Sequence, residues 1–250
     1  MIKIILAGCN GYMGRVVTTI MSDDPESTIV AGIDINTEKP DDYPVYADPN
    51  EITENADVII DFSNPAALDG LLKYATATKT PLILCATGYT EEQINKIENT
   101  SKQIPIFRSG NMSLGINLLA DLIKRACTVL GEDFDIEIIE RHHRRKVDAP
   151  SGTALMLADA ATEALPHKTE YIFERESKRE PRKKQEIGIS AVRGGTIVGV
   201  HDIIFAGQDE VIELRHTAAS RDIFATGAIK AAKFIMDKPP GIYDMKNVLA

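Results

Sequence analysis

The chain has 250 residues, of which 44% are hydrophobic and 26% are charged, and its formal net charge is -9. This length and composition fit a globular protein that buries a sizeable core and divides into two domains, and they do not indicate disorder. The negative charge argues against a general polyanion binder, so we expect no nucleic-acid partner.

Cysteine usage and the N-terminal sequence indicate a reducing compartment. Cys9, Cys85 and Cys127 are too few and too scattered for a disulfide framework, and no CxxC pair suggests zinc. The apolar run at residues 2–7 leads straight into glycines, without the longer apolar region and cleavage site of a signal peptide. No stretch approaches the roughly 20 apolar residues that span a bilayer. We therefore expect a cytoplasmic protein with no membrane partner.

Short apolar runs alternate with helix-periodic stretches through the first hundred residues. Strands are predicted at Ile2–Ala7, Thr28–Ile33, Asp57–Phe62, Pro81–Cys85 and Ile104–Phe107. Helices are predicted at Tyr12–Met21, Pro65–Ala77 and Glu91–Lys102, the second with a cap at Ser63 or Asn64. This alternation predicts an α/β fold with a Rossmann-like, doubly wound parallel sheet.

The pattern changes after residue 112. A long amphipathic helix is predicted at Ser113–Leu130 and a shorter helix at Thr153–Leu165. Strand-like runs at Asp135–Glu140, Ile187–Val192, Thr196–Phe205 and Val211–His216 favour a second α+β domain on a mixed or antiparallel sheet. The charged stretch Glu174–Glu186 lacks a core face and is interpreted as a solvated loop or helix end. A last helix, Ile223–Met236, ends before Pro239.

Three glycines stand at the end of the first predicted strand. Gly8, Gly11 and Gly14 form GxxGxxG at the mouth of the first helix, where backbone amides and the helix dipole can hold a pyrophosphate. The spacing departs from GxGxxG, so a tight turn without a ligand is the alternative interpretation. The position between a strand and a helix favours a dinucleotide site.

Asp34 ends the second predicted strand, twenty positions after Gly14. An acidic side chain there accepts hydrogen bonds from the adenosine ribose; the alternative is an ordinary turn or cap carboxylate. A site for NADPH usually offers an arginine near this acid, whereas the nearest cations by sequence are Arg15 and Lys39. We expect NADH to be used at least as well as NADPH.

The densest chemical pattern runs from Glu140 to Thr153, ERHHRRKVDAPSGT, which leaves a strand, turns at PSG and opens a helix. Imidazole and ammonium groups there suit a small dicarboxylate, and amides near Gly152 and Thr153 can take a carboxylate. A solvated charged face and a nucleic-acid patch are the blander alternatives. A zinc site is disfavoured because adjacent histidines on an extended segment point to opposite sides, so we expect no metal.

Five segments together resemble the dihydrodipicolinate reductase family: AGCNGYMG, DFSNP, CATGY, SGNMSLGIN and HHRRKVDAPSGTA. The resemblance covers nearly the whole chain. The last segment, of the form HHxxKxDAPSGTA, is highly specific to that family, whereas many dehydrogenases share the glycine loop.

The resemblance implies roles for individual residues. His142 is a proton donor or acceptor, Lys146 is a proton donor, and His143, Gly152 and Thr153 bind the substrate carboxylates. The residues that it implies for the cofactor are Gly8, Cys9, Asn10, Gly11, Tyr12, Met13, Asp34, Cys85, Ala86, Thr87, Ser109, Gly110, Asn111 and Met112.

The resemblance also implies an activity. With NADH or NADPH, the family reduces 4-hydroxy-tetrahydrodipicolinate, a cyclic imine dicarboxylate, in diaminopimelate and lysine synthesis. Residues 1–112 and 223–250 would bind the cofactor, and residues 113–222 would bind substrate and build a homotetramer. Two alternatives stay open: another semialdehyde or amino-acid dehydrogenase on the same cofactor fold, and a redox sensor that binds NADH without turnover.

The chain departs from the family pattern at two places. The family often has GTTG where this chain has Cys85-Ala86-Thr87-Gly88, which puts side-chain contacts there in doubt. Arg145 stands where a third histidine is common. Its positive charge is expected to lower the pKa of nearby histidines.

Overall fold

The computed structural model describes residues 1–39 and 41–249 and divides into two compact units. The first contains Met1–Leu114 with Asp222–Ala250, and the second contains Gly115–Arg221. The chain therefore leaves the first unit along one helix and returns to it with another.

The first unit is built on a seven-stranded sheet in the order β12-β6-β5-β4-β1-β2-β3, in which every pair of neighbours is parallel. The strands are β1 Ile2–Ala7, β2 Ser27–Ile33, β3 Val45–Tyr46, β4 Val58–Asp61, β5 Leu82–Leu84, β6 Pro105–Arg108 and β12 Gly241–Tyr243. The predicted doubly wound parallel sheet is confirmed.

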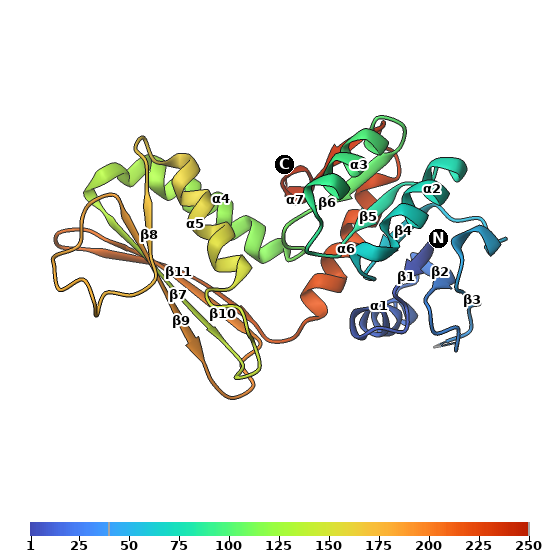
Figure 1. Cartoon of the computed structure of the whole chain (residues 1–250), viewed down its shortest axis with the longest axis horizontal. Coiled ribbons are helices and arrows are strands. Elements are labelled where there is room, and N and C mark those ends of the chain that lie inside the picture. The colour runs from blue at the N-terminus through green and yellow to red at the C-terminus, as the bar shows by residue number, and fades with distance from the viewer. Residues whose placement is uncertain (40, 250) are drawn as a thin grey trace. The chain divides into compact units, whose positions relative to one another are not determined.

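Helices cover both faces of this sheet (Figure 1). They are α1 Tyr12–Ser22, α2 Leu68–Thr78, α3 Glu91–Ser101, α6 Asp222–Ile235 and α7 Met245–Leu249, with short 3-10 turns at Pro49–Glu51 and Pro65–Ala67. Because side chains alternate along a strand, Ile4 and Leu6 pack with α1 and α6, whereas Ile5 and Ala7 pack with α2 and α3. Runs that are apolar at every position are thus explained by burial on two faces.

The second unit carries a five-stranded mixed sheet in the order β11-β10-β7-β9-β8. Its elements are α4 Leu114–Leu130, a 3-10 turn Gly131–Asp133, β7 Asp135–His142, α5 Gly152–Ala164, β8 Glu170–Ile172, β9 Glu186–Arg193, β10 Gly199–Ala206 and β11 Val211–Ala218. Strand β10 is antiparallel to β7 and β11, whereas β9 is parallel to β7 and β8. The predicted mixed sheet is confirmed.

Helices α4 and α5 pack on one face of this sheet, where Ile136, Ile138, Ile189 and Phe205 are buried. The alternate residues of the same strands form the other face, which we call the open face. It carries the half-buried Ile139 and Ile204 and the exposed Val192 and Val211.

Several predicted boundaries differ from the structure. Four elements were not predicted, β3, β8, β12 and α7, because they have two to five residues and are too short to show a period. Strand β7 extends two residues beyond Glu140, and β10 begins at Gly199 rather than Thr196. Glu186 belongs to β9 and is buried, because Arg175 pairs with it at 2.7 Å.

Candidate active site

The carboxyl ends of the parallel strands in the first unit place the implied cofactor residues along one edge. Residues 8–13 follow β1, Asp34 follows β2, residues 85–87 follow β5 and residues 109–112 follow β6. The strand order reverses between β1 and β4, so a crevice is expected beyond the ends of these two strands. Ligands of open α/β sheets bind at such a point.

The glycine loop fits a closely approached phosphate. Gly8 has a φ of +76°, which favours glycine, and a Cβ there would lie 2.7 Å from the Ser63 nitrogen. A Cβ on Gly14 would lie 2.1 Å from the Gly8 carbonyl oxygen. Gly11 is the N-cap of α1 and brings no side chain to that helix end. Helix N-terminal amides can therefore approach a pyrophosphate closely.

Asp34 ties the glycine loop to the segment that follows β2. Its Oδ2 accepts a hydrogen bond from the Asn10 backbone N–H at 3.0 Å, and its Oδ1 accepts one from the Asn36 N–H at 3.0 Å. The Asn10 side chain donates to the carbonyl oxygens of Asn36 and Glu38, each at 2.7 Å. Asp34 is thus fixed beside the glycine loop, where the ribose is expected.

The implied cofactor residues differ in how far their side chains are exposed. Cys9 and Met112 are buried in the core, whereas Tyr12 is 64% exposed. Burial raises the pKa of Cys9 to about 11 and also raises the pKa of Cys85. Both thiols are free, and at neutral pH both stay protonated, which fits a packing role.

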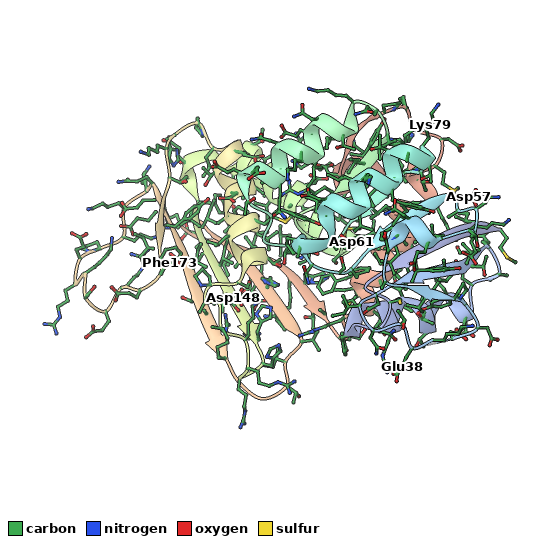
Figure 2. All side chains as sticks on the ribbon, turned by 45° about the vertical axis from the view of Figure 1, so that its right-hand side comes forward. Glu38, Asp57, Asp61, Lys79, Asp148 and Phe173 are labelled. Carbon is green, nitrogen blue, oxygen red and sulfur yellow. The ribbon has the colours of Figure 1, made fainter. Side chains whose placement is uncertain are left out.

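Asp61, labelled in Figure 2, is the last residue of β4 and had no predicted role. Its side chain is fully buried. Its Oδ1 accepts a hydrogen bond from the Ser63 N–H at 2.8 Å, and the Tyr89 hydroxyl lies 3.4 Å from Oδ2. Burial raises the pKa of Asp61 despite these bonds. The Asp61 carboxyl holds the turn that packs against Gly8. In the sequence, the position of Asp61 between an apolar strand and the letters SNP could have indicated this structural role.

In the second unit, His142 is the last residue of β7 and is buried. Because alternate residues share a face, its side chain lies on the same face as Glu140. His142 Nδ1 lies 2.6 Å from Glu140 Oε2. Arg193, at the end of the neighbouring β9, donates two hydrogen bonds to the Glu140 carboxylate, at 2.6 and 2.7 Å. The Ser151 N–H donates a fourth, at 3.0 Å.

The charge state of Glu140 follows from these contacts. Burial opposes its ionisation, but the hydrogen bonds from Arg193, His142 and Ser151 outweigh burial and lower its pKa. The side chain is fully buried yet stays a carboxylate at neutral pH. Glu140 therefore accepts every hydrogen bond that it makes.

His201 on β10 completes this cluster. Its ring meets that of His142 edge-on, with the centroids 5.2 Å apart, and its Nε2 lies 3.1 Å from Ser151 Oγ. Burial, reinforced by the positive charge of a protonated His142, lowers the pKa of His201 to about 4. His201 is thus a neutral neighbour of His142.

The loop after β7 supplies the other implied substrate residues. Lys146 Nζ lies 2.8 Å from Asp148 Oδ1, and this hydrogen bond lowers the pKa of Asp148. Ser151 caps α5 by accepting a hydrogen bond from the Ala154 N–H at 3.1 Å, so Gly152 and Thr153 form the first turn of the helix. That turn is where a carboxylate is favoured by the helix dipole.

His143 differs from His142 in its surroundings. Burial is the main cause that lowers the pKa of His143, and the positive charge of Arg145 lowers it further. The predicted effect of Arg145 on a neighbouring histidine is confirmed. A neutral His143 carries one ring N–H, which can donate a hydrogen bond to a substrate carboxylate.

Family models cover almost the whole chain. Residues 2–112 match the N-terminus of dihydrodipicolinate reductase, and residues 115–249 match its C-terminus. The chain belongs to the dihydrodipicolinate reductase family. The resemblance found in the five sequence segments is therefore confirmed. The chain belongs to a family of reductases, which are oxidoreductases.

Individual members of the dihydrodipicolinate reductase family are close in sequence and length. A 4-hydroxy-tetrahydrodipicolinate reductase of Caldanaerobacter subterraneus is 55% identical over all of this chain and 98% of its own. One of Clostridium tetani is 51% identical over all of this chain and 97% of its own. Among solved structures, a dipicolinate-bound dihydrodipicolinate reductase from Paenisporosarcina has a TM-score of 0.83 at 24% identity, covering 99% of each chain. This last likeness is one of fold.

Within residues 1–39 and 41–249, no group of three or more His, Cys, Asp or Glu side chains is arranged to hold a metal ion. No helix in this described part is long and apolar enough to cross a bilayer.

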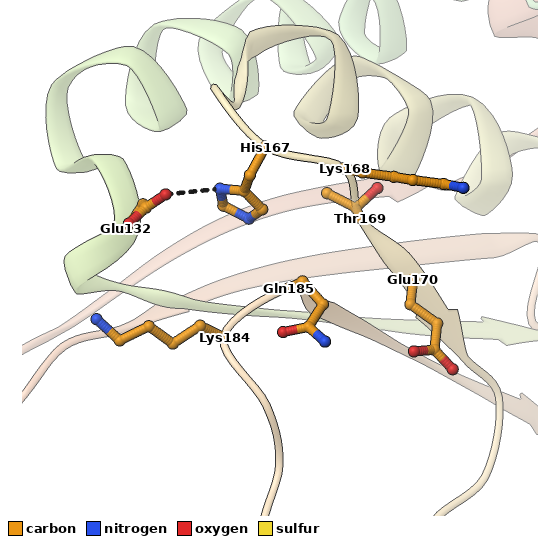
Figure 3. Close-up of a pocket in the computed structure, with 7 residues that line it drawn as sticks. All are labelled: Glu132, His167, Lys168, Thr169, Glu170, Lys184 and Gln185. Atoms are coloured by element: carbon orange, nitrogen blue, oxygen red, sulfur yellow. Dashed lines mark ion pairs between the residues drawn. The ribbon is translucent and has the colours of Figure 1, made fainter.

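A separate cavity of about 690 Å³ lies at the opposite end of β7 from His142. Figure 3 shows its lining, in which His167 Nδ1 pairs with Glu132 at 3.1 Å. Lys168, Glu170 and Lys184 surround this pair with mixed charge. The cavity contains neither the Glu140 cluster nor the glycine loop, so we place the chemistry elsewhere.

Proposed function

We propose that the chain catalyses NAD(P)H-dependent reduction of 4-hydroxy-tetrahydrodipicolinate to tetrahydrodipicolinate, a step of diaminopimelate and lysine synthesis, in the cytoplasm. The observation that carries the proposal is the ionised, buried Glu140 holding His142 beside the Lys146 loop and the capped N-terminus of α5. Family membership and the names of the close relatives support the same reaction.

The residues of the second unit have roles that follow from their chemistry. His143 and the α5 first turn, at Gly152 and Thr153, hold the two carboxylates of the cyclic imine. Lys146 stabilises or protonates the developing enamine, and His142 handles the second proton near neutral pH. Loss of the 4-hydroxyl as water, with a proton from the carbon between C4 and the imine carbon, would leave a double bond conjugated with the imine. The nicotinamide, when bound, would supply a hydride to C4 of this double bond, and the resulting enamine would take up a proton at the neighbouring carbon.

Cofactor choice follows from the segment around Asp34. The Asp34 carboxylate accepts ribose hydroxyls well but repels a 2′-phosphate. Arg15 and Lys39 line a neighbouring cavity of about 380 Å³, together with Glu38, and offset that repulsion in part. NADH is therefore used at least as well as NADPH.

Turnover is tested by following NADH and NADPH oxidation with the imine formed in situ from pyruvate and aspartate semialdehyde. The expected result is turnover with both nucleotides and a kcat/KM for NADH that equals or exceeds that for NADPH. Turnover on aspartate semialdehyde or homoserine, with none on the imine, would favour another dehydrogenase. Binding of NADH without any turnover would favour a redox sensor.

Assembly is proposed as a homotetramer, formed through the open face defined above. On that face, Asp202 is 3% exposed between Arg141 and Arg215, and apolar side chains flank this ion network. A sheet face of this kind is covered in a stable assembly, because exposed apolar area is costly.

Light scattering measures this assembly directly. The expected mass is about four times 27.4 kDa. Ile139→Asp combined with Ile204→Asp should give smaller species, whereas Val129→Asp, at an exposed position of α4, should leave the mass unchanged. A monomeric wild type would contradict the proposal.

A further inference from the structure

Glu140 makes four hydrogen bonds, and each oxygen accepts two of them. Oε2 faces His142 Nδ1 at 2.6 Å and an Arg193 nitrogen at 2.7 Å. Oε1 faces the other Arg193 nitrogen at 2.6 Å and the Ser151 N–H at 3.0 Å. Arginine and backbone N–H groups can only donate, so three of the four nitrogen atoms that face Glu140 have a fixed role.

The fourth nitrogen atom is His142 Nδ1, and the other three donors determine whether it donates or accepts. An ionised carboxylate accepts only, so Nδ1 must carry a proton to make a hydrogen bond of 2.6 Å. In the neutral ring Nε2 then keeps the lone pair. A Cβ on Gly199 would lie 3.1 Å from this Nε2, so the glycine keeps the space beside it open.

We propose that Glu140, held by Arg193 and the Ser151 N–H, is a positioning residue that fixes His142 as the Nδ1–H tautomer, with Nε2 as its proton-exchanging atom. This inference deepens the proposed function and rests on it for the role of His142. Glu140 acts through His142 and reaches no substrate itself, since its side chain is fully buried.

Replacing Glu140 by glutamine gives a specific expected outcome. If the amide nitrogen took the Oε1 place, it would face two fixed donors, Arg193 and the Ser151 N–H. In the Oε2 place it faces one fixed donor and His142, which can respond by giving up its Nδ1 proton. The second arrangement is favoured, and it leaves His142 as the Nε2–H tautomer.

The experiment combines nitrogen-15 NMR of the histidine rings with kinetics on the full chain. The chain has five histidines, so the His142 signals can be assigned by their loss in His142→Gln. We expect Nδ1 protonated in wild type and Nε2 protonated in Glu140→Gln. We also expect kcat to fall by roughly 10²- to 10⁴-fold, with little change in KM for the imine.

Glu186→Gln is the matched control. Glu186 is 2% exposed, lies on the same sheet and pairs with Arg175 at 2.7 Å. It should change neither the His142 signals nor kcat.

The outcomes separate the two proposals. An Nε2–H tautomer in wild type, or an unchanged tautomer and kcat in Glu140→Gln, would overturn the positioning role even in an active enzyme. Absence of turnover in wild type would instead overturn the proposed function, while the ring signals still report the tautomer. If Glu140→Gln does not fold, the wild-type spectrum decides by itself.

Discussion

Changing His142 to Gln and Lys146 to Ala together is expected to lower kcat for imine reduction by roughly 10³- to 10⁴-fold. His142 is held by Glu140 at 2.6 Å, and Lys146 is oriented by Asp148 at 2.8 Å, so both groups are preset for proton transfer. The two losses should not add, because residues that serve one step act as a unit. Stopped-flow and steady-state assays with NADH measure the effect.

The same chemical changes elsewhere in the unit provide the control. His167→Gln with Lys168→Ala alters the cavity of Figure 3, where the Glu132 partner is 53% exposed. This variant should keep kcat within about twofold of wild type, since the cavity lies at the opposite end of β7 from His142 and the exposed ion pair contributes little to stability. An equal loss of kcat in both double variants would contradict a catalytic role for His142 and Lys146.

Arg193→Met is expected to lower the free energy of unfolding by about 3–5 kcal/mol at neutral pH. Glu140 is fully buried, and Arg193 provides two of its four hydrogen bonds. Without the guanidinium, a buried carboxylate is left without its charge partner. Urea unfolding followed by circular dichroism measures the loss.

The pH dependence of this loss has a definite sign. In wild type the pKa of Glu140 is lowered, so its contribution to stability is present above the unfolded-state pKa of roughly 4.3 and is lost as pH falls. In Arg193→Met, burial should dominate and raise that pKa, so protonation relieves the penalty. The difference between wild type and variant should therefore shrink as pH falls from 8 to 4.

Lys96→Met is the control for this prediction. The Lys96 side chain is 41% exposed, and its partner Asp69, 3.1 Å away, is 69% exposed. A loss below about 1 kcal/mol is expected. An equal loss of unfolding free energy in both variants would show that the buried Glu140 does not need Arg193 as its charge partner.

The longer elements of local structure and the identity of the chemical groups could be predicted from the sequence. Period-two and all-apolar runs predicted β1, β2, β4, β5 and β6, because burial on one or both faces selects side chains position by position. The glycine loop and the stretch from Glu140 to Thr153 are continuous in the chain. Their composition therefore pointed to a dinucleotide and a small dicarboxylate without knowledge of packing.

The contacts between side chains that are distant in the sequence could not be predicted from it. Arg193 reaches Glu140 across 53 residues, and His201 reaches Ser151 across 50, because β9 and β10 flank β7 in one sheet. Strand order and register depend on the packing of the whole unit, and a single sequence does not encode them in any local period. For that reason the motif predicted His142, whereas the contacts of its ring with Glu140 and His201 emerged from the fold.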